Sequence, residues 1–80
     1  MNSGCKDALP GKMTSNSNCK KLKQTCTKLK SKCSKSLASA LGSSSNANKC
    51  KTALGSAKNK KVNEYCKITC NKCGEFNRSV

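Results

Sequence analysis

The 80-residue sequence contains no histidine and no tryptophan, and its only aromatic residues are Tyr65 and Phe76. Acidic residues are almost as rare: Asp7, Glu64 and Glu75 are the three in the chain. Without a histidine or an evident carboxylate pair there is no general acid and base, so we expect no enzymatic activity and no cofactor. The scarcity of aromatic rings argues against a pocket lined by them and against stacking on single-stranded nucleic acid.

Large apolar side chains are also scarce. Leucine, isoleucine, valine and phenylalanine together make up 10 of the 80 residues. That share lies below the roughly 20% at which a strongly charged chain is expected to be disordered. No apolar run approaches the ~20 residues of a membrane-spanning helix, so we expect no transmembrane segment.

Cysteine is the abundant residue that reverses this expectation. An even number in a short chain predicts full pairing, and each bridge typically contributes about 2–4 kcal/mol. Four bridges would then supply roughly 8–16 kcal/mol, which is comparable to the stability of an ordinary domain. We expect structural disulfides, no metal site and an unfolded reduced chain. The eight residues are Cys5, Cys19, Cys26, Cys33, Cys50, Cys66, Cys70 and Cys73.

Cysteine content also predicts the location of the protein. Disulfides persist in oxidising compartments, so the chain is expected to be secreted. The segment Met1-Asn2-Ser3-Gly4-Cys5 lacks the apolar region of a signal peptide. Either a leader was removed or the chain is cytosolic, and the cysteine content favours a removed leader.

A helical pattern begins near residue 18. Apolar and cysteine residues recur three and four positions apart, as on one face of a helix. This pattern predicts a helix over residues 18–41, capped by Asn18 and stopped by Gly42. The residues that carry it are Cys19, Leu22, Cys26, Leu29, Cys33, Leu37 and Leu41.

Weaker patterns predict helices over residues 46–58 and 61–70. Ser45 or Asn46 is the expected cap of the first of these, and Gly55 favours a break near residues 55–60. Residues 1–17 should be irregular and residues 74–80 a loose tail. The predicted fold is all-α, a single disulfide-stapled domain over residues 1–80, built as a hairpin of two to three helices with an irregular N-terminal loop.

Such a hairpin restricts the pairing of the cysteines without fixing it. Cys33 and Cys50 flank the loop and are the expected inter-helix pair, while Cys5 and Cys73 would tie the ends. The remaining two cysteines of the first helix would pair with Cys66 and Cys70, in an order that stays open. Eight cysteines allow 105 connectivities.

The segment from Tyr65 to Gly74 resembles the end of a ShKT domain, the small domain named for a sea-anemone potassium-channel toxin. Cys66, Cys70 and Cys73 have the Cys-x3-Cys-x2-Cys spacing of that family, and Thr69 occupies its threonine position. The resemblance covers about ten residues, and the longer upstream spacers and eight cysteines depart from the family's six. It implies a pairing of the first cysteine with the last, here Cys5 with Cys73.

This resemblance also implies a function. Some family members block potassium channels with a lysine followed directly by a tyrosine, a dipeptide that this chain lacks. The nearest substitute is Lys61 with Tyr65, one helical turn apart, and Lys67 is a further candidate. An ion channel is therefore one expected partner.

Positive charge is the most informative feature. Seventeen basic residues against three acidic ones give a formal charge of +14, far more than solubility requires. Such an excess predicts a polyanionic partner, bound without sequence-specific reading of nucleic acid, because lysine acts as a hydrated point charge. The candidate anion-binding residues share the first predicted helix: Lys20, Lys21, Lys23, Lys28, Lys30, Lys32 and Lys35.

Together these features predict a secreted cationic effector of the antimicrobial or venom type that adsorbs to anionic membrane surfaces. Deep insertion is not expected, because cysteine occupies much of the apolar face where an interfacial helix carries leucine or tryptophan. Two alternatives stay open: an ion-channel toxin of ShKT type, and an extracellular protein that binds heparin-like glycans.

Overall fold

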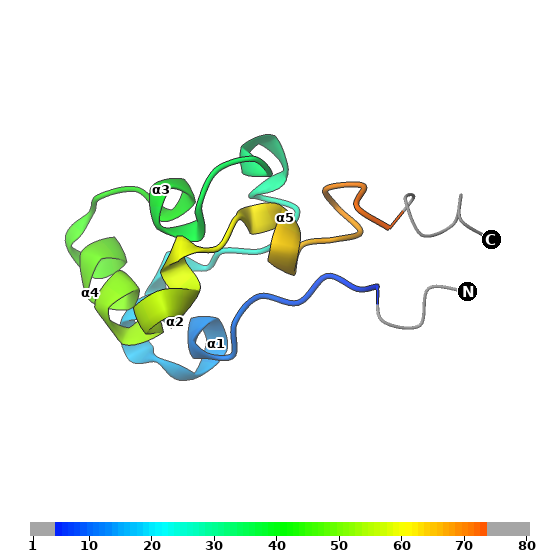
Figure 1. The fold of residues 1–80 in the computed structure, drawn as a ribbon. Helices are drawn as coiled ribbons and strands as arrows, with labels where there is room; N and C mark the ends of the chain where they lie inside the picture. Colours follow the sequence, from blue (N-terminus) through cyan, green and yellow to red (C-terminus); the bar gives the residue numbers. More distant parts are fainter. Residues whose placement is uncertain (1–4, 74–80) are drawn as a thin grey trace.

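The computed structural model describes residues 5–73 of the chain. Within this range the chain folds into short helices joined by irregular segments (Figure 1). The all-α class is confirmed, but the helices are shorter and more numerous than the predicted two to three. They are α1 (Lys12–Ser15), α2 (Ser17–Leu22), α3 (Leu37–Leu41), α4 (Ser45–Leu54) and α5 (Val62–Tyr65), with 3-10 helices η1 (Lys30–Lys32) and η2 (Gly55–Asn59).

The single helix predicted over residues 18–41 is wrong. Helix α2 begins one residue earlier, because the Asn16 side chain, rather than that of Asn18, accepts hydrogen bonds from the first free N–H groups. The helix ends at Leu22, where Lys23 takes a left-handed conformation (φ 50°). Seven uncompensated lysines and a thin apolar stripe do not stabilise a long helix, so the chain turns instead.

The stop predicted at Gly42 is confirmed, although it ends a different helix. Gly42 has φ 83° and caps the five-residue α3, which begins after Ser36. The left-handed backbone there favours a residue without Cβ. Between α2 and α3 the chain is irregular at residues 23–25, forms turns and η1, and then makes a single antiparallel bridge from Ser36 to Lys61.

The other predicted boundaries also need correction. Helix α4 is capped by Ser44 rather than by Ser45 or Asn46, and it ends at Leu54 instead of residue 58. Gly55 (φ 61°) follows it, at the predicted break. The segment predicted as helix 61–70 is helical only through α5, because residues 67–70 form turns. In the segment predicted as irregular, residues 12–15 form α1. The tail predicted at 74–80 lies outside the described residues.

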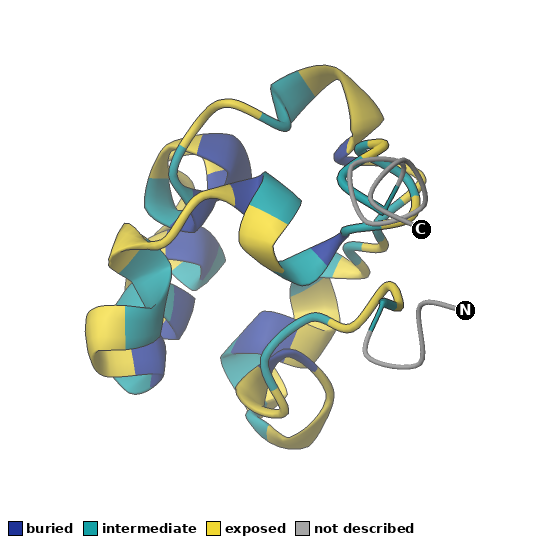
Figure 2. Ribbon diagram, turned by 45° about the vertical axis from the view of Figure 1, so that its right-hand side comes forward, coloured by how far each residue is buried: buried dark blue, intermediate teal, exposed yellow. Residues whose placement is uncertain are grey.

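The core is small, and its apolar side chains are supplemented by sulfur. Buried positions of α2, α3 and α4 turn inward (Figure 2). Three of the cysteines, Cys19, Cys50 and Cys66, are 0% exposed, as are Leu37 and Val62. The other buried apolar residues are Met13, Leu29, Ala40, Leu41, Ala47 and Leu54. Disulfides therefore occupy core positions that leucine or isoleucine fills in larger domains.

All eight cysteines are paired. The bridges are Cys5–Cys73, Cys19–Cys50, Cys26–Cys66 and Cys33–Cys70. The expected bridge between Cys5 and Cys73 is confirmed, and one of the two partners considered for Cys26 is the observed one. The predicted pair Cys33–Cys50 is wrong, because α2 rather than the segment around residue 33 packs on α4. Cys50 therefore meets Cys19.

Short backbone pairings replace a sheet. The N–H of Leu37 donates to Lys60 O (2.8 Å), and the N–H of Val62 donates to Lys35 O (2.9 Å). A further pairing joins the N-terminal segment to the end of α5, where Ala8 N donates to Tyr65 O (2.8 Å). The segment after Cys5 thus runs beside the segment that ends at Cys73, away from helices α1 to α4 (Figure 1).

Candidate functional site

The seven lysines predicted to lie on the first helix are divided among several elements. Lys20 and Lys21 are exposed on α2, and Lys23 follows it directly. Lys30 and Lys32 lie on η1, which Figure 1 shows well apart from α2. Because the long helix does not form, there is no single cationic stripe; positive charge is spread around the molecule.

Two of these seven side chains have structural roles. Lys28 Nζ donates to Lys23 O (2.9 Å), and Lys32 Nζ donates to Ala40 O (3.3 Å). Each ammonium group thus donates a hydrogen bond to a backbone carbonyl near the end of a helix, where carbonyl groups lack partners within the helix. Lys35 is exposed, and its backbone pairs with Val62.

The two described carboxylates bind backbone groups. Glu64 Oε2 accepts a hydrogen bond from Lys61 N (3.0 Å) and thereby caps α5. Asp7 Oδ1 accepts one from Thr69 N (2.9 Å), and Asp7 Oδ2 accepts one from the Thr69 hydroxyl (2.5 Å). No side chain of a charged residue is buried among residues 5–73. The surface therefore keeps its strongly positive character.

Asp7 is a structural residue that sequence reasoning missed. Partial desolvation raises its pKa, but hydrogen bonds from the Thr69 side chain and from the backbone of Thr69 and Ile68 outweigh that effect, so the pKa lies below 3.8. The contact joins residues 62 positions apart. The sequence singled out Thr69 only for its place between Cys66 and Cys70, and nothing in it identified Asp7 as the partner of Thr69.

Replacing Asp7 with asparagine is expected to remove an acid-labile contribution to stability. A carboxylate with a lowered folded-state pKa stabilises the fold above its unfolded pKa, and this contribution is lost as the pH falls through the folded value. The wild-type melting temperature should drop below pH 4, and that of Asp7→Asn should drop less. At pH 7 the variant should lose about 0.5–1 kcal/mol, because the contact is exposed.

Thermal unfolding followed by circular dichroism at pH 7, 4 and 2.5 measures this difference. Glu64→Gln is the matched control, since it removes the other described carboxylate. Parallel acid profiles for wild type and Asp7→Asn would contradict the assignment.

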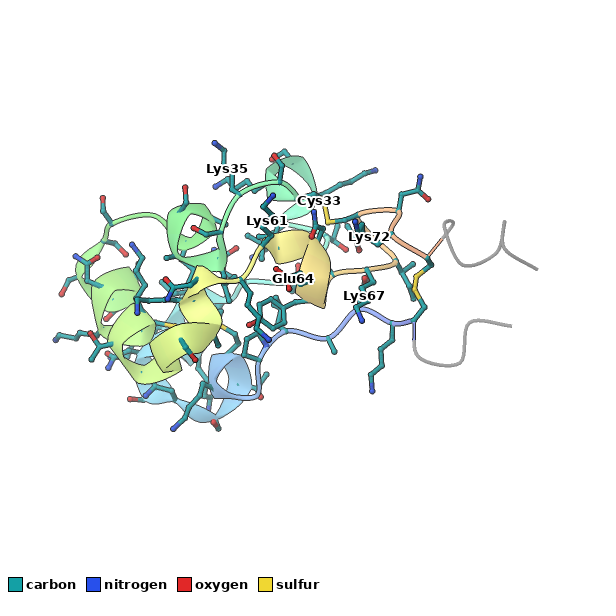
Figure 3. The ribbon with its side chains drawn as sticks, in the orientation of Figure 1. Cys33, Lys35, Lys61, Glu64, Lys67 and Lys72 are labelled. Atoms are coloured by element: carbon teal, nitrogen blue, oxygen red, sulfur yellow. A yellow bond between two sulfur atoms is a disulfide. The ribbon has the colours of Figure 1, made fainter. Side chains whose placement is uncertain are left out.

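The three channel-block candidates do not form one compact group. Lys61 precedes α5 and is exposed, whereas Lys67 follows α5 and is half-buried; Figure 3 shows them on different sides of Glu64. The Tyr65 hydroxyl donates to Ala57 O (2.8 Å). Burial, together with the nearby charge of Glu64, raises the pKa of Tyr65, so its hydroxyl stays protonated at neutral pH.

The exposed surface of residues 5–73 carries one large hydrophobic side chain, Ile68, at 58% exposure. None of the helices in this range has both the length and the apolar character needed to span a bilayer. Cys70 and Cys73 have the Cys-x2-Cys spacing of half a zinc site, but both are in disulfides, so neither sulfur is a thiolate ligand. The chemistry that this surface offers to a partner is therefore mainly that of ammonium groups.

No protein-family model matches the sequence, and comparisons with curated proteins and with solved structures found no significant match.

Proposed function

We propose that the protein is a secreted, non-enzymatic cationic effector that adsorbs to anionic membrane surfaces. The observation that carries this proposal is the combination of sixteen lysines, none of them buried, with a core closed by four disulfides. Because sulfur supplements the core, few apolar residues are needed and the surface can hold a large uniform charge. A protein of this design approaches any extended negative surface favourably.

The distribution of the lysines supports adsorption rather than specific docking. Lysines occur on α1, α2, α4, η1, η2 and the segments between them, so several orientations present comparable charge. Exposed apolar side chains are needed for insertion into the acyl region. Since Ile68 is the large one exposed within residues 5–73, we expect binding without deep penetration.

Vesicle co-sedimentation tests the proposal. Four lysines at the surface, at about 1 kcal/mol each, should raise the partition constant roughly 1000-fold on anionic vesicles relative to neutral ones. The gain should shrink as NaCl rises from 50 to 500 mM, because salt screens these charges. Dye-filled vesicles of equal phosphatidylcholine and phosphatidylglycerol should retain their dye.

Lysine acetylation of the oxidised protein is the control, because it removes charge and leaves the disulfides. Equal binding to neutral and anionic vesicles, or strong leakage at a low protein-to-lipid ratio, would overturn the adsorption proposal.

Channel block of the ShKT type is a second candidate. The observation that favours it is the disulfide map: Cys5 pairs with Cys73, and Cys66 and Cys70 bond to Cys26 and Cys33 within the segment that the first predicted helix spanned. Against it stands the separation of Lys61 from Lys67, with the Tyr65 hydroxyl tied to Ala57. The large positive charge of the protein therefore favours adsorption to membranes over channel block. Binding of heparin-like glycans would depend on the same positive charge, and no separate feature of the protein favours it.

A further inference from the structure

A hollow of about 330 Å³, open to solvent, lies where α1, α2 and the turn after α2 meet. Buried Met13 is one of its lining residues, and the others are polar or charged. Helices α1 and α2 are in contact with each other and with α4, so the hollow belongs to the disulfide-braced part of the molecule. Its lining consists of Met13, Thr14, Lys20, Lys23, Gln24 and Thr25.

Two lysines line this hollow. Lys20 and Lys23 are both exposed, and neither side chain donates a hydrogen bond to another residue of the described range 5–73. The lining contains no carboxylate. Both described carboxylates are engaged elsewhere, Asp7 with Thr69 and Glu64 with Lys61 N. The hollow thus carries two positive charges with no internal counter-charge.

Two uncharged residues of the lining, Gln24 and Thr25, keep hydrogen-bond donors. The Thr25 hydroxyl accepts from Lys28 N (3.2 Å), which leaves its own hydrogen free to donate. Gln24 Nε2 donates one hydrogen to Leu22 O (3.4 Å) and has a second. An oxyanion in the hollow would therefore meet hydrogen-bond donors as well as charge.

The turn that carries Lys23 is held in place. Lys23 has φ 50°, a conformation uncommon for residues other than glycine and asparagine. Lys23 N donates to Lys20 O (3.1 Å), and Lys28 Nζ donates to Lys23 O (2.9 Å). Such strained backbone recurs at ligand-binding positions, and here it brings Lys23 to the same hollow as Lys20.

We propose that this hollow binds the phosphate monoester group of an anionic lipid. The proposal rests on the proposed function, and it deepens it by giving the membrane surface a preferred headgroup. A phosphate monoester carries about −1.5 to −2 charges at pH 7, which matches two ammonium groups. Phosphodiesters and sulfate esters carry a single charge and match them less well. The lining has no aromatic ring for a sugar to stack on, which disfavours a glycan.

Glycerol 3-phosphate is the soluble probe of this site. Titrated into the ¹⁵N-labelled oxidised protein at constant ionic strength, it should give saturable shifts of the amide signals of Met13, Thr14 and residues 20–25. Glycerophosphoglycerol, a phosphodiester, and glucose 6-sulfate, a sulfate ester, should each bind roughly tenfold more weakly, because each carries a single negative charge. Affinity for glycerol 3-phosphate should fall as the pH drops through about 6, where the monoester takes up a proton.

The variant Lys20→Gln/Lys23→Asn should weaken glycerol 3-phosphate binding roughly tenfold or more, since each lost ammonium removes a charge-assisted hydrogen bond. Asparagine is chosen at position 23 because it tolerates the left-handed backbone. The matched control is Lys49→Gln/Lys60→Gln, which removes the same charge from exposed residues that do not line the hollow. This control should bind the probe as the wild type does.

Three results would overturn the site: shifts spread evenly over all lysines, equal losses in the two double variants, or tighter binding of glucose 6-sulfate than of glycerol 3-phosphate. Measuring adsorption to vesicles distinguishes failure of the phosphate site from failure of the proposed function. If adsorption to phosphatidylglycerol persists while glycerol 3-phosphate fails to bind, the site is wrong and the function stands. Saturable probe binding without adsorption to phosphatidic acid vesicles would reject the membrane function and the lipid assignment of the site.

Discussion

Reduction of all four disulfides, followed by alkylation with iodoacetamide, is expected to abolish the helical circular dichroism signal at neutral pH. The bridges together are worth roughly 8–16 kcal/mol, which matches or exceeds the stability of an ordinary domain. The helices left behind have four to ten residues, and such short helices do not persist alone in water. Iodoacetamide adds no charge, so the comparison isolates the covalent links.

Salt provides the control for this experiment. At 1 M NaCl the screening length falls to about 3 Å, which removes most of the repulsion between lysines. The reduced chain should stay unfolded there, because its apolar residues are too few. Cooperative thermal unfolding of the reduced, alkylated protein, with or without salt, would contradict the role assigned to the disulfides.

Removal of the Cys19–Cys50 bridge alone, by Cys19→Ala/Cys50→Ala, is expected to destabilise the protein by about 4 kcal/mol or more. The bridge spans 31 residues, for which loss of loop-closure entropy accounts for about 4 kcal/mol. Both cysteines are fully buried between α2 and α4, so deletion of the sulfur atoms also costs on the order of 1 kcal/mol each. Chemical denaturation followed by circular dichroism gives the free energy of unfolding.

The matched control is Cys5→Ala/Cys73→Ala. That bridge spans 68 residues, so chain entropy alone predicts a slightly larger loss, but its cysteines are only half-buried. We expect the buried pair to matter more, because packing adds to entropy there. A larger loss of stability in Cys5→Ala/Cys73→Ala would show that the constraint on the unfolded chain dominates.

The sequence predicted the helical class and the cysteine-supported core, but not where the helices end. Periodicity at residues 19–41 indicated which side chains face inward, and Cys19, Leu29, Leu37 and Leu41 are indeed buried. The same spacing fits one long helix or several turns. Tertiary packing decided between them, and only a local signal such as Gly42 could be placed in advance.

The sequence could predict which residue type forms the candidate site, but not where in the fold those residues lie. Charge alone identified the lysines, yet the hollow beside Lys20 and Lys23 depends on the turn after α2. That turn follows from the left-handed conformation of a lysine, which no propensity rule favours. Likewise, the contact between Asp7 and Thr69 depends on the bridge that brings the two chain segments together.

The four bridges share a topology that bears on resistance to proteolysis. Each joins a cysteine in residues 5–33 to one in residues 50–73, and Cys5–Cys73 encloses the other three. A protease that cuts any one peptide bond between Cys5 and Cys73 therefore leaves the two pieces covalently attached. For a chain with sixteen lysines, each a cleavage site for trypsin-like enzymes, a first cut changes neither mass nor charge appreciably. A molecule cut once would therefore keep its size and its full positive charge.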